Sequence, residues 1–168
     1  MKILISLLLI IFVHSVDDLA SNANIDDLYD PVRISNAIMS LKEEYPEGTP
    51  WTEENTYRWY GTEKIFNTLG LSYINGHGCA AFAFMASDVA FGKETPVYKF
   101  FDKDEIRIGD VVQAKCPTFL HFIIVVEDLG NYTYRVAEGN CGSAVRYGRI
   151  YDLNDCTINK GYTRYPPK

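Results

Sequence analysis

The chain has 168 residues, of which 47% are hydrophobic and 14% aromatic, and its 22 acidic side chains outnumber its 16 basic ones. This length suits one compact domain, and the composition excludes a disordered or low-complexity chain. The net charge of −6 argues against a nucleic-acid partner, whose phosphates require a basic face. The chain holds three histidines and four cysteines, so imidazole or thiol chemistry has few possible positions.

The first fifteen residues are predicted to be a secretory signal peptide. Met1-Lys2 gives a short positive start, and residues 3–13 form an unbroken apolar run. As a helix of about 16 Å this run is too short for a hydrocarbon core of ~30 Å. Small residues favour cleavage after Ser15; a cut after Ala23 and an uncleaved anchor are the weaker alternatives. We therefore expect a secreted protein without membrane contact after cleavage, in an oxidising environment where disulfides persist.

After this segment we expect a flexible lead-in over residues 16–30 and a single domain over residues 31–168. The lead-in is acidic and polar. Pro31 begins an amphipathic stretch with apolar residues at helical spacing, which ends at Tyr45-Pro46. An aromatic-rich connector, residues 51–69, follows it.

A second helix is predicted over residues 79–91. Gly76 and Gly78 break the chain before it, and Gly92 follows as a C-cap. Its residues are alanine or large and apolar nearly all round, which indicates a buried helix rather than a surface one.

Short apolar or alternating runs then predict strands. They cover residues 110–114, 121–127, 132–138, 144–150 and 162–165. Because the helices come first and the strands second, the expected fold class is α+β, with an antiparallel sheet of about five strands packed on the second helix.

Cys79 is the candidate nucleophile. At the first position of a helix, unpaired backbone N–H groups and the positive dipole end favour the thiolate, which is the reactive form. The preceding Gly-His-Gly lets a substrate come close, and the Cys79 N–H is a candidate oxyanion donor. A packed core cysteine is the alternative interpretation.

A nucleophilic cysteine requires a base, and histidine is the usual one. His14 would leave with the signal peptide, and His77 lies two residues from Cys79 on a glycine-flanked turn. His121 begins an apolar strand and shares a face with Ile123. We therefore select His121.

The strand register suggests a third member of the site. A two-residue turn at Leu129-Gly130 would place His121 directly opposite Glu138, with Cβ atoms roughly 4.5–5.5 Å apart. Asn140 follows two residues later on the same face. Both are candidates to orient the imidazole, and a slip of one residue would remove this geometry.

The order of these segments resembles the CHAP and NlpC-like group of papain-like cysteine amidases and peptidases. The segments are Gly78–Phe82, Ile108–Val112, His121–Val125 and Val136–Asn140, and Tyr147–Arg149 is similar to a variant in bacterial amidase-domain proteins. The resemblance covers roughly residues 76–153. One departure is that Phe119 and Leu120 stand where the family often places glycine before the histidine.

This resemblance implies a papain-like fold and thiol hydrolysis of an amide bond in a peptide or peptidoglycan fragment. Cys79 would attack the carbonyl, His121 would transfer the proton, and Glu138 or Asn140 would hold the ring. It implies a monomer without a cofactor. The sequence itself lacks Cys-x-x-Cys and His-x-x-x-His spacings, so we expect no metal.

If Cys79 is reduced, three cysteines remain, and the sequence leaves their pairing open. Cys141–Cys156 would close a loop worth on the order of 3 kcal/mol, and Cys116–Cys156 is equally possible. Asn131 begins a glycosylation sequon, which matters in a eukaryotic secretory pathway.

Two other functions remain open. In a secreted, non-enzymatic binding module, Cys79 would form a disulfide and the aromatic residues Trp51, Trp59, Tyr60 and Tyr73 would line a groove. A thiol deamidase or acyltransferase would use the same acyl-enzyme with another acceptor.

Overall fold

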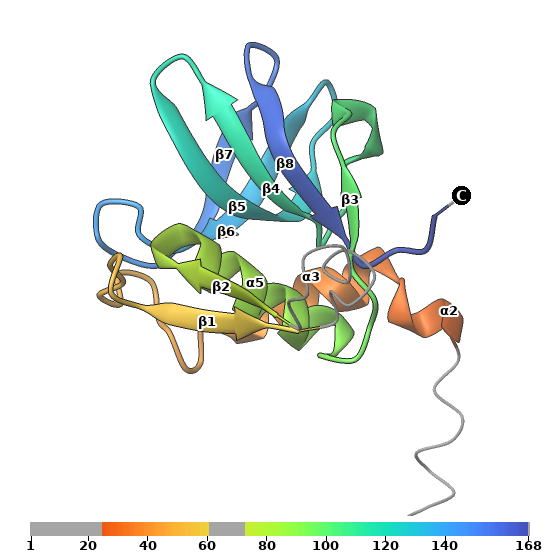
Figure 1. Ribbon diagram of the computed structural model, residues 1–168, viewed down its shortest axis with the longest axis horizontal. Helices are drawn as coiled ribbons and strands as arrows, with labels where there is room; N and C mark the ends of the chain where they lie inside the picture. The colour runs from red at the N-terminus through yellow and green to blue at the C-terminus, as the bar shows by residue number, and fades with distance from the viewer. Residues whose placement is uncertain (1–24, 61–72, 168) are drawn as a thin grey trace, which may run out of the picture.

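The computed structural model describes residues 25–60 and 73–167 (Figure 1). The predicted signal peptide and both of its candidate cleavage sites lie outside the described residues. Among the residues that are described, no helix has the length and apolar character needed to cross a membrane.

The domain begins earlier than the sequence indicates. A short helix, α2 (Ile25–Leu28), precedes the first predicted helix, and the Tyr29 ring packs on Phe91 and Tyr165 with centroids 6.3 and 5.4 Å away. The last part of the lead-in over residues 16–30 is therefore packed on the domain, contrary to the prediction of a flexible segment.

Helix α3 (Pro31–Ser40) begins as predicted, with Asp30 as N-cap and Pro31 in the first turn. Asp30 Oδ1 accepts a hydrogen bond of 2.7 Å from the Arg33 N–H. Ile34 and Ile38, one helical turn apart, are completely buried. The helix ends at Ser40, before the predicted end, and hydrogen-bonded turns continue the chain.

Helix α5 (Gly78–Phe91) lies at the centre of the molecule, and eleven of its fourteen residues are buried. It packs against α3, strand β5 of the sheet and a separate hairpin of β1 (Thr56–Trp59) and β2 (Ile74–His77) (Figure 1). The alanines let these elements approach closely, which confirms the prediction of a buried helix. The hairpin was not predicted.

The sheet has six antiparallel strands in the order β3-β8-β4-β5-β6-β7. Their bounds are β3 (Tyr98–Phe100), β4 (Val111–Cys116), β5 (Phe119–Asp128), β6 (Thr133–Glu138), β7 (Arg146–Asp152) and β8 (Thr157–Thr163). The α+β class is confirmed. The prediction missed the short edge strand β3 and placed β8 several residues too late.

Both faces of β5 are buried. Phe122, Ile124 and Val126 belong to the core beneath α5, whereas Ile123 and Val125 face a second cluster. Figure 1 shows the strands of the sheet curling, and the residues of that second cluster are buried. Burial on both faces explains why β5 is an apolar run instead of an alternating one.

A disulfide between Cys116 and Cys156 joins the end of β4 to the residue before β8. Of the two pairings that the sequence left open, this is the one present. Its residues are 40 apart in sequence, so loop closure contributes on the order of 4 kcal/mol.

A buried ion pair fixes the C-terminal part of α5. The Arg164 side chain, 1% exposed, pairs with Asp88, 2% exposed. Arg164 also donates to the Gly92 carbonyl oxygen at 3.1 Å, and Tyr57 Oη donates to Asp88 Oδ2 at 2.7 Å. A buried pair with further hydrogen bonds holds the partners in one geometry.

Asp110, completely buried before β4, predicts a pH-dependent stability. Burial raises the pKa of this carboxyl to about 7, whereas the unfolded chain releases the proton near pH 4. The folded state therefore binds more protons, and the free energy of unfolding falls as the pH rises between these values.

Asparagine does not titrate, so in Asp110→Asn we expect the free energy of unfolding to fall with pH by at least about 1 kcal/mol less than in the wild type. The amide oxygen can still accept the hydrogen bond from the Arg107 N–H, which lies 2.9 Å from Oδ2 in the wild type. Urea unfolding from pH 4.5 to 8 measures it, with Asp155→Asn on the surface as control. A stability difference between Asp110→Asn and the wild type that is the same at every pH would contradict this account.

Candidate active site

Cys79 lies in the first turn of α5, as predicted, and is partly exposed and outside the disulfide. Gly78 before it has a φ of 50°, which favours glycine. The Gly78 N–H donates to the Asn55 carbonyl oxygen, and Trp51 Nε1–H donates to the Gly78 carbonyl oxygen, both at 2.9 Å. The segment before β1 therefore fixes the start of the helix.

His121 lies near the start of β5 and pairs with Ala114 of β4. Burial would raise the pKa of the Cys79 thiol, but the hydrogen bond with the His121 ring and one with the backbone of Phe122 lower it below its usual value. The thiol therefore ionises more readily than an ordinary cysteine, although it is largely enclosed.

The pKa of His121 moves in the opposite direction. Burial would lower it, yet the polar contacts with Cys79 and Glu138, together with their negative charges, raise it to about 9. A lowered thiol pKa beside a raised imidazole pKa favours a thiolate–imidazolium pair.

Glu138, at the end of β6, is completely buried. Its Oε2 lies 2.8 Å from His121 Nε2. The ring N–H is not aligned with the carboxylate as a regular hydrogen bond, so the contact is an ion pair. Burial would raise the pKa of Glu138, but His121 and Tyr151 lower it. The carboxylate stays ionised beside the imidazolium.

The predicted register between β5 and β6 is wrong. The turn is longer than two residues: the Leu129 N–H donates to the Thr133 carbonyl oxygen at 2.9 Å, and Asn131 has a left-handed φ of 51°. Val125 pairs with Val136, and the register shifts after it. Continuing this register places Glu138 across from Ile123, diagonal to His121.

Despite this difference, Glu138 lies on the same face of the sheet as His121. Side chains alternate with a period of two, and the predicted and observed pairings near Val125 differ by two residues. Diagonal neighbours on one face lie within reach of long side chains. Glu138 therefore contacts His121, although it is not directly opposite.

Asn140, the other candidate, points elsewhere. It has a left-handed φ of 58°, and its Nδ2 donates to Glu53 Oε2 at 3.1 Å. A Cβ atom on Gly78 would lie 2.8 Å from Asn140 Nδ2. Asn140 therefore lies against the start of α5, where it contacts the backbone beside the nucleophile.

Two residues of β7, which the sequence analysis did not assign to the site, support Glu138. Tyr151 Oη donates to Oε2 at 2.8 Å, and Arg149 Nη1 donates to Oε1 at 3.0 Å. They lie two residues apart on the strand beside β6, and the resemblance of Tyr147–Arg149 to amidase-domain proteins did not assign either of them a role. Only the pairing of β6 with β7 brings them to the carboxylate.

The other histidine and the other free cysteine lie outside this row of contacts. The side chain of His77 is exposed and makes no hydrogen bond within the described part of the chain. Cys141 Sγ accepts from Arg149, and burial raises the pKa of its thiol. The prediction of His121 rather than His77 therefore agrees with the geometry.

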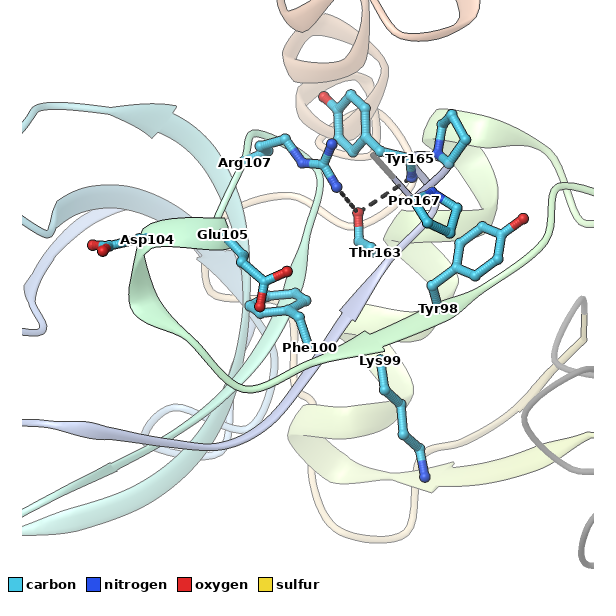
Figure 2. A pocket seen from close by; sticks show the side chains of 10 residues that line it. Tyr98, Lys99, Phe100, Asp104, Glu105, Arg107, Thr163, Tyr165 and Pro167 are labelled. Atoms are coloured by element: carbon cyan, nitrogen blue, oxygen red, sulfur yellow. Dashed lines mark hydrogen bonds between the residues drawn. The ribbon is translucent and has the colours of Figure 1, made fainter.

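A pocket of about 580 Å³ lies near the C-terminus, between β3, β8 and the short 3₁₀ helix Lys103–Glu105. Figure 2 shows Arg107, Thr163 and Tyr165 along it, with Thr163 accepting from both neighbours. His121 pairs with Ala114 of β4, and Ala114 pairs with Ile158 of β8. Thr163 lies five residues farther along β8 than Ile158, which corresponds to roughly 16 Å. Its lining contains neither cysteine nor histidine, so it is separate from the Cys79 site.

No family model, no curated protein and no solved structure matched the chain in comparisons with known proteins. Within residues 25–60 and 73–167, no group of three or more metal-binding side chains could hold an ion. The site brings together the Cys79 thiol with its lowered pKa, the His121 imidazole, which can carry a proton, and the buried Glu138 carboxylate.

The ion pair predicts the pH dependence of Cys79 alkylation. The rate with iodoacetamide should fall less steeply toward low pH than that of an ordinary cysteine, because the His121 ring lowers the pKa of the Cys79 thiol. In His121→Ala, burial without the imidazolium raises the thiol pKa, so the rate at pH 6 should fall on the order of a hundredfold. Peptide mapping by mass spectrometry from pH 5 to 9 measures each site separately.

Cys141 is the internal control for this experiment, since its thiol pKa is raised and its labelling should increase only at higher pH. Identical pH profiles for Cys79 in the wild type and in His121→Ala would disprove the ion pair.

Proposed function

We propose that the protein is a thiol hydrolase of amide bonds that acts through Cys79, His121 and Glu138. The observation that carries this proposal is the 2.8 Å contact between His121 Nε2 and the buried Glu138 carboxylate on β6, beside a thiol at the start of α5 whose pKa the His121 ring lowers. Nucleophile, base and orienting group recur in this arrangement in acyl-transfer enzymes of unrelated folds.

In this mechanism the Cys79 thiolate forms a bond to the substrate carbonyl carbon. Backbone N–H groups at the start of α5, that of Cys79 among them, are placed to bind the oxyanion. The C–N bond then breaks as His121 gives its proton to the leaving amine. Water, deprotonated by His121, attacks the thioester and releases the acid and the free thiol.

Glu138 and its neighbours keep the imidazole in place during both proton transfers. The carboxylate is completely buried, so its charge acts on the ring with little screening by solvent. Tyr151 and Arg149 hold its two oxygens. We assign Glu138, Tyr151 and Arg149 as positioning residues and keep the catalytic role for Cys79 and His121.

The proposed substrate class is a peptide, in particular a peptidoglycan fragment. The resemblance of the segments around Cys79, His121 and Glu138 to CHAP and NlpC-like enzymes supports it, as does the α+β fold with the nucleophile at a helix start. The disulfide between Cys116 and Cys156 is compatible with secretion into an oxidising compartment.

A binding module is less consistent with the structure. That function needs Cys79 in a disulfide and Trp51 and Trp59 on a groove, yet Cys79 is free and the two rings are 6% and 1% exposed. A deamidase or acyltransferase would use the same site, and the acceptor that reaches the acyl-enzyme would distinguish it.

Incubation with purified muropeptides tests the proposal directly. Mass analysis should show fragments that have gained one water for the wild type. It should show none for Cys79→Ala, which removes the thiol but places another small residue in the helix. Transfer to an added amine in place of water would indicate an acyltransferase. If the wild type cleaves neither muropeptides nor a peptide library, hydrolysis by this site is excluded.

Two variants separate the candidate orienting groups. Glu138→Gln keeps the shape but removes the charge beside His121, and should lower kcat at least a hundredfold. It should also lower the upper pKa of the pH–rate profile, because Glu138 helps to raise the pKa of His121. Asn140→Ala should lower kcat less than tenfold and leave that upper pKa in place. A larger shift of the upper pKa in Asn140→Ala would assign the orienting role to Asn140.

A further inference from the structure

The segment between α3 and β1 forms a wall beside the nucleophile. It holds Gly78 through Trp51 and Asn55, as described above, and between these two anchors Glu53 extends over the start of α5. A Cβ atom on Gly78 would overlap with the Glu53 carboxylate. This carboxylate therefore lies next to the residue that precedes Cys79.

The carboxylate is fixed in this place and still open to solvent. Asn140 Nδ2 donates to Oε2 at 3.1 Å, and Glu53 itself is exposed. In the described part of the chain, Glu53 forms no ion pair and Oε1 accepts no hydrogen bond. An anchored anion with a free oxygen is suited to bind a cation.

We propose that Glu53 selects substrates with a positively charged ammonium group on the residue next to the scissile amide. This inference rests on the proposed function and adds the charge of the substrate to it. A substrate whose carbonyl carbon is in contact with Cys79 Sγ has its neighbouring residue about 3.8 Å farther along its chain, and the Glu53 carboxylate lies against Gly78, the residue directly before Cys79. An ammonium group there gains a charge-assisted hydrogen bond.

No other charged group in contact with Glu53 neutralises this subsite within the described residues. Asn140 is neutral, and the remaining contacts of Gly78 are with the backbone of Asn55 and the ring of Trp51. Arg149, the cation beside the buried carboxylate, is held by Glu138 and Cys141. The subsite therefore has a net negative charge next to a positively charged His121.

The substrate test uses two peptides that differ in one group: an ammonium on the residue next to the scissile amide, or the same nitrogen acetylated. The ratio of kcat/KM between the ammonium and the acetylated peptide should exceed one for the wild type. It should fall on the order of tenfold in Glu53→Gln, since the charge-assisted bond becomes a neutral one. Glu54→Gln, an exposed neighbour, is the matched control.

A labelling experiment tests the same charge without requiring hydrolysis. Cys79 is modified by a trimethylammonium-bearing and by a sulfonate-bearing methanethiosulfonate reagent at low salt, and peptide mapping measures both rates. A unit charge about 6 Å away in water-like surroundings changes each rate by about threefold, in opposite directions. Glu53→Gln should therefore lower the cation-to-anion rate ratio on the order of tenfold, and Glu53→Lys should lower it further.

The two experiments distinguish the possible failures. If no peptide is hydrolysed but the labelling ratio falls stepwise from the wild type to Glu53→Gln to Glu53→Lys, the charged subsite exists and the proposed hydrolysis is wrong. If the ratio is the same for the wild type, Glu53→Gln and Glu54→Gln, the subsite is disproved, whether or not peptides are cleaved. Because Glu53 is exposed, these variants are expected to fold, which circular dichroism verifies.

Discussion

The buried charge of Glu138 is the constraint on which the site depends. An isolated carboxylate in a protein interior is strongly unfavourable unless cations and hydrogen-bond donors surround it. Here the donors come from both neighbouring strands: His121 from β5, and Arg149 and Tyr151 from β7. The same set that stabilises the carboxylate holds the imidazole ring. Charge compensation in the fold and orientation of the base are therefore one arrangement.

The nucleophile is fixed by a second, independent set of contacts. α5 is buried along most of its length and bound at its C-terminal part by the Asp88–Arg164 pair. At its other end, Trp51 and Asn55 hold Gly78. A helix that is buried along most of its length cannot slide without breaking its packing, so the thiol keeps its position relative to the sheet.

Local sequence features predicted the elements that carry chemistry, and long-range pairing decided what the sequence could not predict. The glycines on either side of the Cys79 helix and its small or apolar residues predict that helix. The apolar run that begins at His121 predicts its strand. The register failed because Asn131 and Tyr132, at φ of 51° and 56°, extend the turn, and no residue pattern marked that. Glu138 was still found, because the observed shift of two residues preserves the face. Arg149 and Tyr151 were missed since they depend on the pairing of a further strand.

In the function that we propose, the residues that would carry the reaction are separate from the residue that we assign to substrate selection. Cys79, His121 and Glu138 lie on α5, β5 and β6, whose backbones are fixed by packing and by the sheet. Glu53 and Asn140 lie on connecting segments and contact only the surface of the helix start. Substitutions in such segments change charge and shape without moving a core residue. A change of substrate preference is therefore compatible with an unchanged triad, whereas a change in the β5–β6 register by one residue would remove Glu138 from the imidazole altogether.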